Sequence, residues 1–196
     1  MTNFIETELT ESLKGLPTRT TQFGRFDKGL AYTILMKYYM HEKNWAKAEE
    51  CGRELLKAEY GYGLMDRYAD IFTLENEGNK EIIFACTEER GTNLQLWHDH
   101  ALPGNYPTKN ASIQKWDGYK VPWPFYRTFE EGDDRLSVLV GEYVGTDGVL
   151  FNEESDIAKH GNLYSGAVPV KYGEDPESTG DGSQIDLVVY RYADAV

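Results

Sequence analysis

Aromatic and polar residues gather in the segment 87–126, where neither a helical nor a strand period is visible. A flat aromatic ring can stack on the C–H face of a ligand, and a nearby amide or carboxylate can hydrogen-bond to its hydroxyl groups. The alternative is that these rings fill the core of a loop-rich region. The side chains that we predict to contact a ligand are Trp97, Trp116, Trp123, Tyr106, Tyr126, Asn93 and Asp117.

Two other groups of residues have side chains that metal ions use. The imidazoles of His98 and His100 are two residues apart, so on an extended segment they would face the same way. Two ligands do not make a site, and the sequence positions no third. The segment 175–186 contains side-chain oxygens that could bind calcium, but they do not follow the sequence pattern of an EF-hand loop. A solvated acidic loop is therefore the simpler interpretation. The residues that carry these oxygens are Asp175, Glu177, Asp181, Ser183 and Asp186. We therefore predict neither a metal nor a cofactor.

Carboxylate pairs of the kind that glycosidases use occur at Glu88-Glu89 and Asp133-Asp134. Adjacent carboxylates on a strand point apart, which argues against a paired catalytic role. The sequence also has no Gly-x-Ser-x-Gly elbow and no phosphate-binding loop. We predict that the protein is not an enzyme.

The charge and the cysteines exclude several classes of protein. Against 33 acidic residues there are 20 basic ones, a formal net charge of −13, which disfavours binding to nucleic acids and anionic lipids. The most apolar stretch, 30–40, is too short to span a membrane. Cys51 and Cys86 are too few for a disulfide scaffold. We expect them to be small buried hydrophobic residues, with a mutual disulfide as the alternative.

The elements that would position the aromatic segment begin with three helices. Apolar residues four apart predict a helix over 3–14, and a wide apolar face predicts a second over 28–41 with Asp27 as its N-cap. Asn44 can cap a third helix, on which Trp45, Leu55 and Leu56 are expected to face the core.

The second and third helices fit the tetratricopeptide pattern, in which bulky and small residues recur at fixed offsets so that two helices approach closely. One such pair cannot bury its own face, so neighbouring elements must pack on it. The matching positions are Tyr32, Leu35, Tyr39, Ala48 and Leu55.

Beyond the helices, the pattern is weaker. The segment 81–86 is apolar on both faces and predicts a buried strand, and 138–144 favours another. The segment 125–139 is typical of a short helix with a turn. We expect 152–182 to be a solvated loop region, and 185–196 to begin a helix.

Several of these segments, in this order, resemble motifs of the SusD/RagB family. The resemblance covers residues 24–194 and is carried by Gly24-Arg25-Phe26-Asp27-Lys28-Gly29, Trp45-Ala-Lys-Ala48, Tyr68-Ala-Asp-Ile-Phe72, Asn79-Lys-Glu-Ile-Ile-Phe84, Phe129-Glu-Glu-Gly-Asp-Asp-Arg135 and Asp186-Leu-Val-Val-Tyr-Arg-Tyr-Ala-Asp194.

The resemblance implies a mainly α fold, with a tetratricopeptide-like helical pair and an irregular, loop-rich region containing a few short strands. It implies a single SusD-like domain segment over 1–196: a helical part with a strand (1–86), a loop-rich ligand region (87–183) and the start of a truncated helix (184–196). The family's lipid-anchoring motif and first helical repeats would precede residue 1, and its last helices would follow Val196.

The resemblance also implies a function. Members of this family are lipid-anchored outer-membrane proteins of Bacteroidetes, which bind glycans or other nutrients at the cell surface and pass them to a TonB-dependent transporter of the SusC type. The predicted aromatic site would then bind an oligosaccharide without catalysis. Two alternatives stay open: a tetratricopeptide-type adaptor that binds a peptide, and a polysaccharide-degrading enzyme whose two carboxylates face each other across a cleft.

Overall fold

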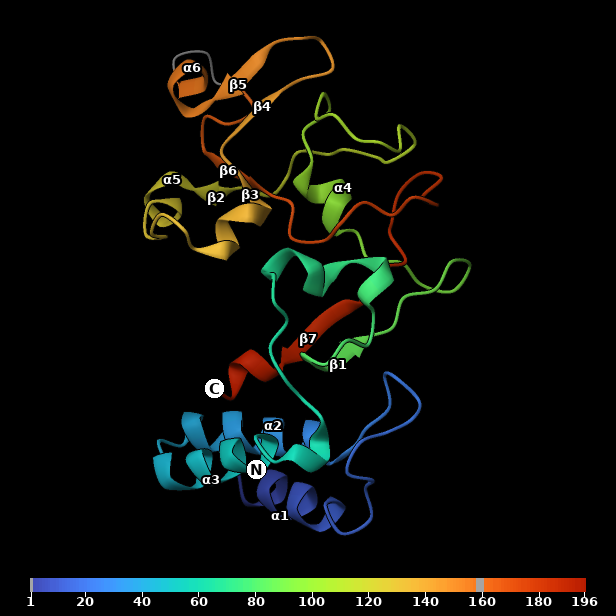
Figure 1. Cartoon of the computed structure of the whole chain (residues 1–196), viewed down its shortest axis with the longest axis vertical. Helices are drawn as coiled ribbons and strands as arrows, with labels where there is room; N and C mark the ends of the chain where they lie inside the picture. The colour runs from blue at the N-terminus through green and yellow to red at the C-terminus, as the bar shows by residue number, and fades with distance from the viewer. Residues whose placement is uncertain (1, 158–160) are drawn as a thin grey trace. The chain divides into compact units, whose positions relative to one another are not determined.

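The computed structural model describes residues 2–157 and 161–196, which form two compact units (Figure 1). Unit 1 contains Met1–Met65, Gly78–Thr87 and Leu187–Val196, and unit 2 contains Asp66–Glu77 and Glu88–Asp186. Unit 2 is therefore inserted into the sequence of unit 1. Helices outweigh strands, and the predicted mainly α architecture with a few short strands is confirmed.

Three helices make up the first part of unit 1, at the lower end of Figure 1: α1 (Thr2–Ser12), α2 (Lys28–His41) and α3 (Trp45–Leu55). Both predicted N-caps are confirmed. The Asp27 carboxylate accepts a hydrogen bond from the Leu30 amide at 2.9 Å, and the Asn44 side chain accepts one from the Lys47 amide at 3.3 Å. Each cap satisfies a backbone donor that the helix itself leaves unpaired.

The tetratricopeptide-like pair α2–α3 packs through the positions that its pattern predicts. Leu35, Tyr39, Ala48 and Leu55 are buried, and Tyr32 is half-buried against the same cluster. The small Ala48 lets the two helices approach, and Cys51 fills the next turn of α3. Helix α1 also packs on α2, with Leu9 and Leu13 against this core.

Two residues of α3 do not lie where the periodicity predicts. Trp45 is 62% exposed and Leu56 is also exposed, although both were expected to face the core. Trp45 is the first residue of α3 and lines an open apolar hollow of about 460 Å³ with Met36 and Met40. The prediction was wrong because helical spacing shows which face is apolar, but not whether a neighbouring element covers that turn.

The two strands of unit 1 join distant parts of the sequence. Strand β1 (Ile82–Cys86), predicted from its apolar run, pairs antiparallel with β7 (Leu187–Arg191), with Ala85 opposite Val188. The predicted helix over 185–196 is therefore wrong: the chain forms β7 and then a 3-10 turn at Tyr192–Asp194. Val188, Val189 and Tyr190 are strand-forming residues, and β1 offers them a partner that local spacing does not reveal.

The two cysteines are both free. Cys51 is buried, as predicted, and burial raises the pKa of its thiol to about 11. Cys86 is exposed, so the expectation that it is a buried hydrophobic residue is wrong. It is the last residue of β1, where the burial of the strand ends.

Unit 2 is built from short elements joined by long loops. Its helices are α4 (Trp97–Ala101), α5 (Trp123–Tyr126) and α6 (Glu153–Ile157), and its 3-10 turns are Tyr68–Phe72, Leu74–Asn76 and Asp134–Val138. Its strands are β2 (Val121–Pro122), β3 (Leu139–Val140), β4 (Glu142–Val144), β5 (Leu150–Asn152) and β6 (Gly166–Pro169).

Strand β6 is the centre of unit 2. It pairs antiparallel with β2 on one side and β3 on the other, whereas β4 and β5 form a separate hairpin. All four residues of β6 are buried, so the expectation of a solvated loop over 152–182 is wrong for this part. A Cβ at Gly166 would lie 2.1 Å from the Val121 carbonyl oxygen, which explains why glycine stands there.

The core of unit 2 surrounds β6 and includes Leu102, Trp123, Tyr143, Leu163 and Val168. It gives the loops a rigid base. None of the helices that the structure describes combines the length and the apolar character that crossing a bilayer requires.

Candidate functional site

The candidate site is organised by the short helix α4. The Gln95 side chain accepts a hydrogen bond from the Trp97 amide at 2.6 Å, which helps to start the helix. Because 97–101 is helical rather than extended, His98 and His100 do not face the same way: His98 is buried, and His100 lies half-buried in an aromatic cluster. The assumption behind the two-histidine metal site was therefore wrong. Among residues 2–157 and 161–196, no group of three or more metal-ligating side chains is found.

Four rings form a continuous aromatic cluster on α4 and the segment 116–119, which we call the aromatic face: Trp97, His100, Trp116 and Tyr119. His100 lies edge-on to Trp116 and stacks on Tyr119, with 4.9 Å between ring centroids in both pairs. Tyr119 in turn contacts Trp97 at 5.5 Å. Trp116 is 45% exposed and Tyr119 is 42% exposed, so these two rings are open to solvent while the other two support them.

Backbone hydrogen bonds hold the aromatic face in place. The amide of Trp116 donates to the Asp99 carbonyl at 2.6 Å, and the amide of Tyr119 donates to the His100 carbonyl at 2.7 Å. The carbonyls at the end of a short helix lack hydrogen-bond donors within the helix, and here the amides of the segment 116–119 supply these donors. Asp117 adopts a φ of 56° in this turn and forms an ion pair with Lys120. Two exposed rings are thus presented on a fixed backbone, next to Asp117, whose carboxylate pairs with the largely buried Lys120.

The other four predicted site residues are not part of this face. Trp123 is only 7% exposed, and its indole donates to the Leu163 carbonyl at 2.9 Å, so it belongs to the core. Tyr126 packs edge-on against Trp123, and Tyr106 packs against Tyr143. Asn93 is exposed and its side chain donates to Glu88 at 2.7 Å. Of the predicted residues, the structure brings Trp97, Trp116 and Asp117 together at the aromatic face, and Tyr106 lines a cavity with Trp97.

Sequence reasoning did not assign Tyr119 and His100 to the site. Their signal was present, since both lie in the tryptophan-rich segment. What the sequence does not show is that the turn at Asp117-Gly118 folds back on the end of α4 and so brings the two rings into contact.

A cavity of about 210 Å³ lies next to the aromatic face. Trp97 belongs to both, and its indole donates to the Pro169 carbonyl at 2.9 Å. The rings of Tyr106 and Tyr172 line the cavity with His98 and Glu174. Tyr172 lies 5.6 Å from Trp97, which continues the row of rings inward.

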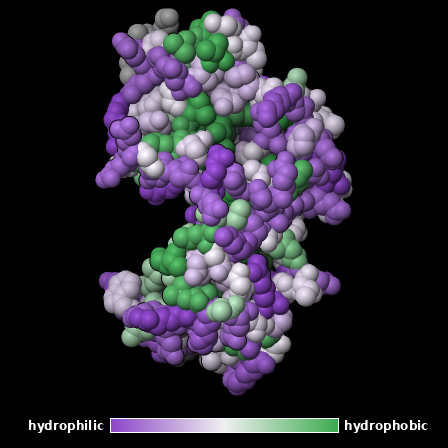
Figure 2. Space-filling model, viewed as in Figure 1, coloured by the Kyte–Doolittle hydropathy of each residue, from purple (hydrophilic) through white to green (hydrophobic). Residues whose placement is uncertain are grey.

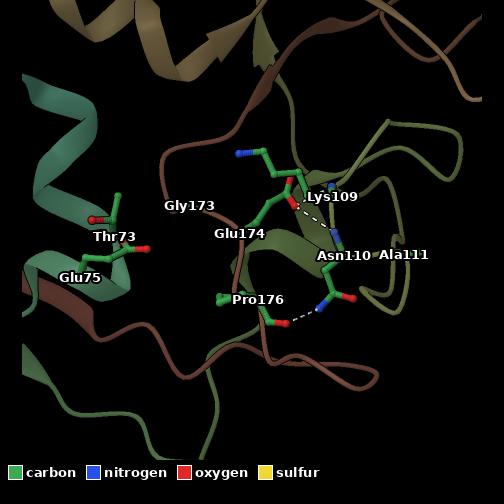
Figure 3. Close-up of a pocket in the computed structure, with 8 residues that line it drawn as sticks. All are labelled: Thr73, Glu75, Lys109, Asn110, Ala111, Gly173, Glu174 and Pro176. Atoms are coloured by element: carbon green, nitrogen blue, oxygen red, sulfur yellow. Dashed lines mark hydrogen bonds between the residues drawn. The ribbon is translucent and has the colours of Figure 1, made fainter.

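A larger hollow, of about 690 Å³, shares Gly173 and Glu174 with this cavity. Figure 3 shows Thr73 and Glu75 on one side of the hollow and Lys109 on the other. The wall is fixed by hydrogen bonds: Glu174 accepts from the Lys109 amide at 2.8 Å, and the Asn110 side chain donates to the Ser178 carbonyl at 2.9 Å. The size lies within the range of small-molecule sites.

The acidic residues weighed as calcium ligands have structural roles. Asp175 is fully buried, and its carboxylate pairs with Arg90 at 3.0 Å and accepts from the Gln184 amide. Asp186 is buried too, which raises the pKa of its carboxyl, and it accepts from the Glu88 amide at 2.9 Å. Asp175, Ser183 and Asp186 are buried, so the expected solvated acidic loop is wrong for these three residues.

The carboxylate pairs weighed for catalysis are also engaged in local structure. Asp133 pairs with Arg135 and accepts a hydrogen bond from its amide, which lowers the pKa of Asp133 to about 2. Asp134 accepts from the Tyr68 amide, and Glu88 accepts from Asn93. These bonds fix turns and loops rather than direct two carboxylates toward a shared point.

On the face shown in Figure 2, most exposed residues are hydrophilic, and hydrophobic residues are exposed in several groups. On unit 1 the exposed apolar residues include Met40, Trp45 and Leu56, which line the hollow beside α3.

Comparison with known proteins identifies the fold. No protein-family model matches the sequence, and no curated protein matches it. Solved structures do match. A SusD-superfamily protein from Parabacteroides distasonis ATCC 8503 superposes with a TM-score of 0.73 and 16% identity, over 97% of this chain and 42% of the other.

Surface glycan-binding protein A from Bacteroides thetaiotaomicron, in complex with laminarihexaose, superposes with a TM-score of 0.71 and 18% identity, over 97% of this chain and 47% of the other. A SusD-superfamily protein from Bacteroides fragilis NCTC 9343 gives 0.71 and 16%, over 97% and 44%. This chain thus spans less than half the length of each. Over that length, it has the fold of SusD-superfamily proteins.

Proposed function

We propose that this protein binds an oligosaccharide, without catalysing a reaction on it, through the aromatic face of unit 2. The observation that carries the proposal is the solvent exposure of Trp116 and Tyr119, which are supported from behind by His100 and Trp97. Exposed apolar groups that gather in one patch often mark a binding site, and these two rings belong to one continuous cluster.

The chemistry of the face suits a sugar. The C–H surfaces of a sugar ring can stack on Trp116 and Tyr119, and the partly exposed Asp117 carboxylate lies in the same turn as an acceptor for hydroxyl groups. Because the backbone of the turn is already bonded to α4, little ordering is required when a ligand binds.

The fold supports the same proposal. Structures that superpose on this chain include proteins described as surface glycan-binding proteins, one of them in complex with laminarihexaose. We propose by analogy that the whole protein captures a glycan or another nutrient at the bacterial outer-membrane surface, held there by a lipid anchor, and passes it to a TonB-dependent transporter of the SusC type.

Affinity electrophoresis in gels that contain different polysaccharides tests glycan binding. We expect the migration of the protein to be retarded by at least one β-glucan or related neutral polysaccharide, and the retardation to be lost in Trp116→Ala. Trp45→Ala is the matched control, because it removes an exposed tryptophan from unit 1. Equal migration of the wild-type protein in every gel would contradict the proposal.

Co-purification tests the transporter partner. We expect the full-length protein, isolated from its native membrane in detergent, to bring with it a TonB-dependent transporter. Purification of the protein without any such transporter would contradict that part of the proposal.

A further inference from the structure

The cavity beside the aromatic face contains a buried polar side chain without a hydrogen-bond partner, whose Nε2 atom lies 3.7 Å from Oδ2 of Asp99. His98 lines the cavity and is 3% exposed, and neither of its ring nitrogens has a hydrogen-bond partner within the described residues. An imidazole that leaves both nitrogens without hydrogen bonds in a protein interior loses its hydration without compensation. Such a residue calls for an explanation.

The surroundings of His98 define what it can bind. Burial lowers the pKa of its imidazole, and the nearby carboxylates of Asp99, Asp175 and Glu174 oppose this to a smaller extent. The ring is therefore neutral at pH 7, with one nitrogen that donates a hydrogen bond and one that accepts.

A neutral hydroxyl-rich ligand matches this ring better than an anionic one. A hydroxyl group both donates and accepts, so hydroxyls can pair with either nitrogen. An ammonium group only donates, and a carboxylate would be repelled by Asp99, Asp175 and Glu174. The three rings of Trp97, Tyr106 and Tyr172 supply the apolar walls that the C–H face of a sugar requires.

We propose that this cavity is a subsite for one uncharged sugar ring, in which His98 hydrogen-bonds to the sugar hydroxyls. The inference rests on the proposed oligosaccharide function and adds the class of sugar. The volume of about 210 Å³ lies below the range of sites for larger ligands, so it takes a single ring rather than a chain. Because Trp97 belongs to both regions, a chain whose terminal ring occupies the cavity can continue over Tyr119 and Trp116.

Calorimetric titration with laminarihexaose tests the subsite through three variants. In His98→Leu the affinity should fall about tenfold, which is the change expected from the loss of one hydrogen bond to a buried group. In His98→Gln the side-chain amide can still form a hydrogen bond, so part of the affinity should be recovered. Thr108→Val is the matched control, since the Thr108 hydroxyl is also buried and unpartnered, and Thr108 is not among the residues lining the cavity. Its affinity should equal that of the wild type.

The two proposals fail in different ways. If Trp116→Ala abolishes binding while folded His98→Leu and His98→Gln bind as the wild type does, the subsite is overturned and the oligosaccharide function stands.

If laminarihexaose does not bind, the subsite is still tested by ¹⁵N NMR of the imidazoles in the wild-type protein, which needs no variant to fold. The His98 signals should shift with glucose and not with glucuronate. Signals that shift with neither sugar, or equally with both, would overturn the subsite.

Discussion

Trp116 and Trp123 show that the surroundings of a tryptophan decide whether it is exposed or buried. Both lie in one irregular segment, and both were predicted to contact a ligand. Trp116 is 45% exposed in the aromatic face, whereas Trp123 is buried with its indole bonded to the Leu163 carbonyl. The sequence shows the residue type, but it does not show which side of a loop faces the core, since no period marks the faces there.

This difference predicts opposite effects on stability and binding. Trp123→Ala should lower the free energy of unfolding by about 3–5 kcal/mol, because it leaves a cavity and an unpaired carbonyl. Trp116→Ala should lower it by less than about 1 kcal/mol, as expected for an exposed site, while glycan binding is lost. Chemical denaturation of both variants measures this. Equal losses of stability would contradict the placement of the two rings.

His98 predicts a dependence of stability on pH. Its pKa in the folded protein is lowered from 6.5, so between 6.5 and the lowered value the unfolded chain binds more protons than the folded one. The contribution of His98 to the free energy of unfolding is therefore fully present above pH 6.5, and it is lost as the pH falls toward the pKa of His98 in the folded protein. The carboxyls of Glu77 and Asp186, whose pKa values burial raises, act in the opposite direction.

The comparison of wild type with His98→Gln isolates the contribution of His98. We expect the unfolding free energy of the wild type to fall more steeply than that of the variant as the pH is lowered from 7.5 to 5.5 (about one unit on either side of the ordinary histidine pKa). Denaturant titrations at several pH values measure both slopes. Parallel slopes would show that the imidazole titrates as it does in water.

At the scale of elements, the local signals were reliable and the long-range ones were not. The caps Asp27 and Asn44 and the apolar face of α2 follow from residues in or next to each helix, and the structure confirms them. The apolar face of α3 is confirmed at Ala48 and Leu55 but not at Trp45 and Leu56. Strand β7 was mistaken for a helix because its partner β1 lies about a hundred residues earlier in the sequence. The buried strand β6 was missed because Gly166 and Pro169 gave it the composition of a loop.

The two caps predict different costs. Asp27 is buried and accepts from the amides of both Leu30 and Thr20, at 2.9 and 3.1 Å. Asp27→Ala should therefore destabilise by about 2 kcal/mol, at the upper end for an N-cap. Asn44 accepts one exposed bond at 3.3 Å, so Asn44→Ala should cost about 0.5–1 kcal/mol. Thermal unfolding followed by circular dichroism ranks them, and a larger loss in Asn44→Ala would contradict the assignment.

At the scale of the molecule, motifs spread from Gly24 to Asp194 indicated the fold, and superposition on SusD-superfamily structures agrees. Their order along the chain was sufficient for this, although none of them describes the ligand. The candidate site is built from loops of unit 2, and their geometry follows from how they pack on the core of that unit. The position of the site could therefore not be predicted from the sequence. The net charge of −13 would repel an anionic ligand, whereas it leaves the binding of a neutral oligosaccharide unaffected.

Calorimetric titration of laminarihexaose into wild type, Trp116→Ala/Tyr119→Ala and Trp45→Ala measures whether the exposed rings of unit 2 bind a neutral oligosaccharide. We predict binding to the wild type and to Trp45→Ala with equal affinity, little changed between about 0.01 and about 1 M salt, where screening lengths fall from about 30 to about 3 Å. We predict no measurable binding to the double variant. Undiminished affinity in a folded double variant would show that Trp116 and Tyr119 do not bind the oligosaccharide.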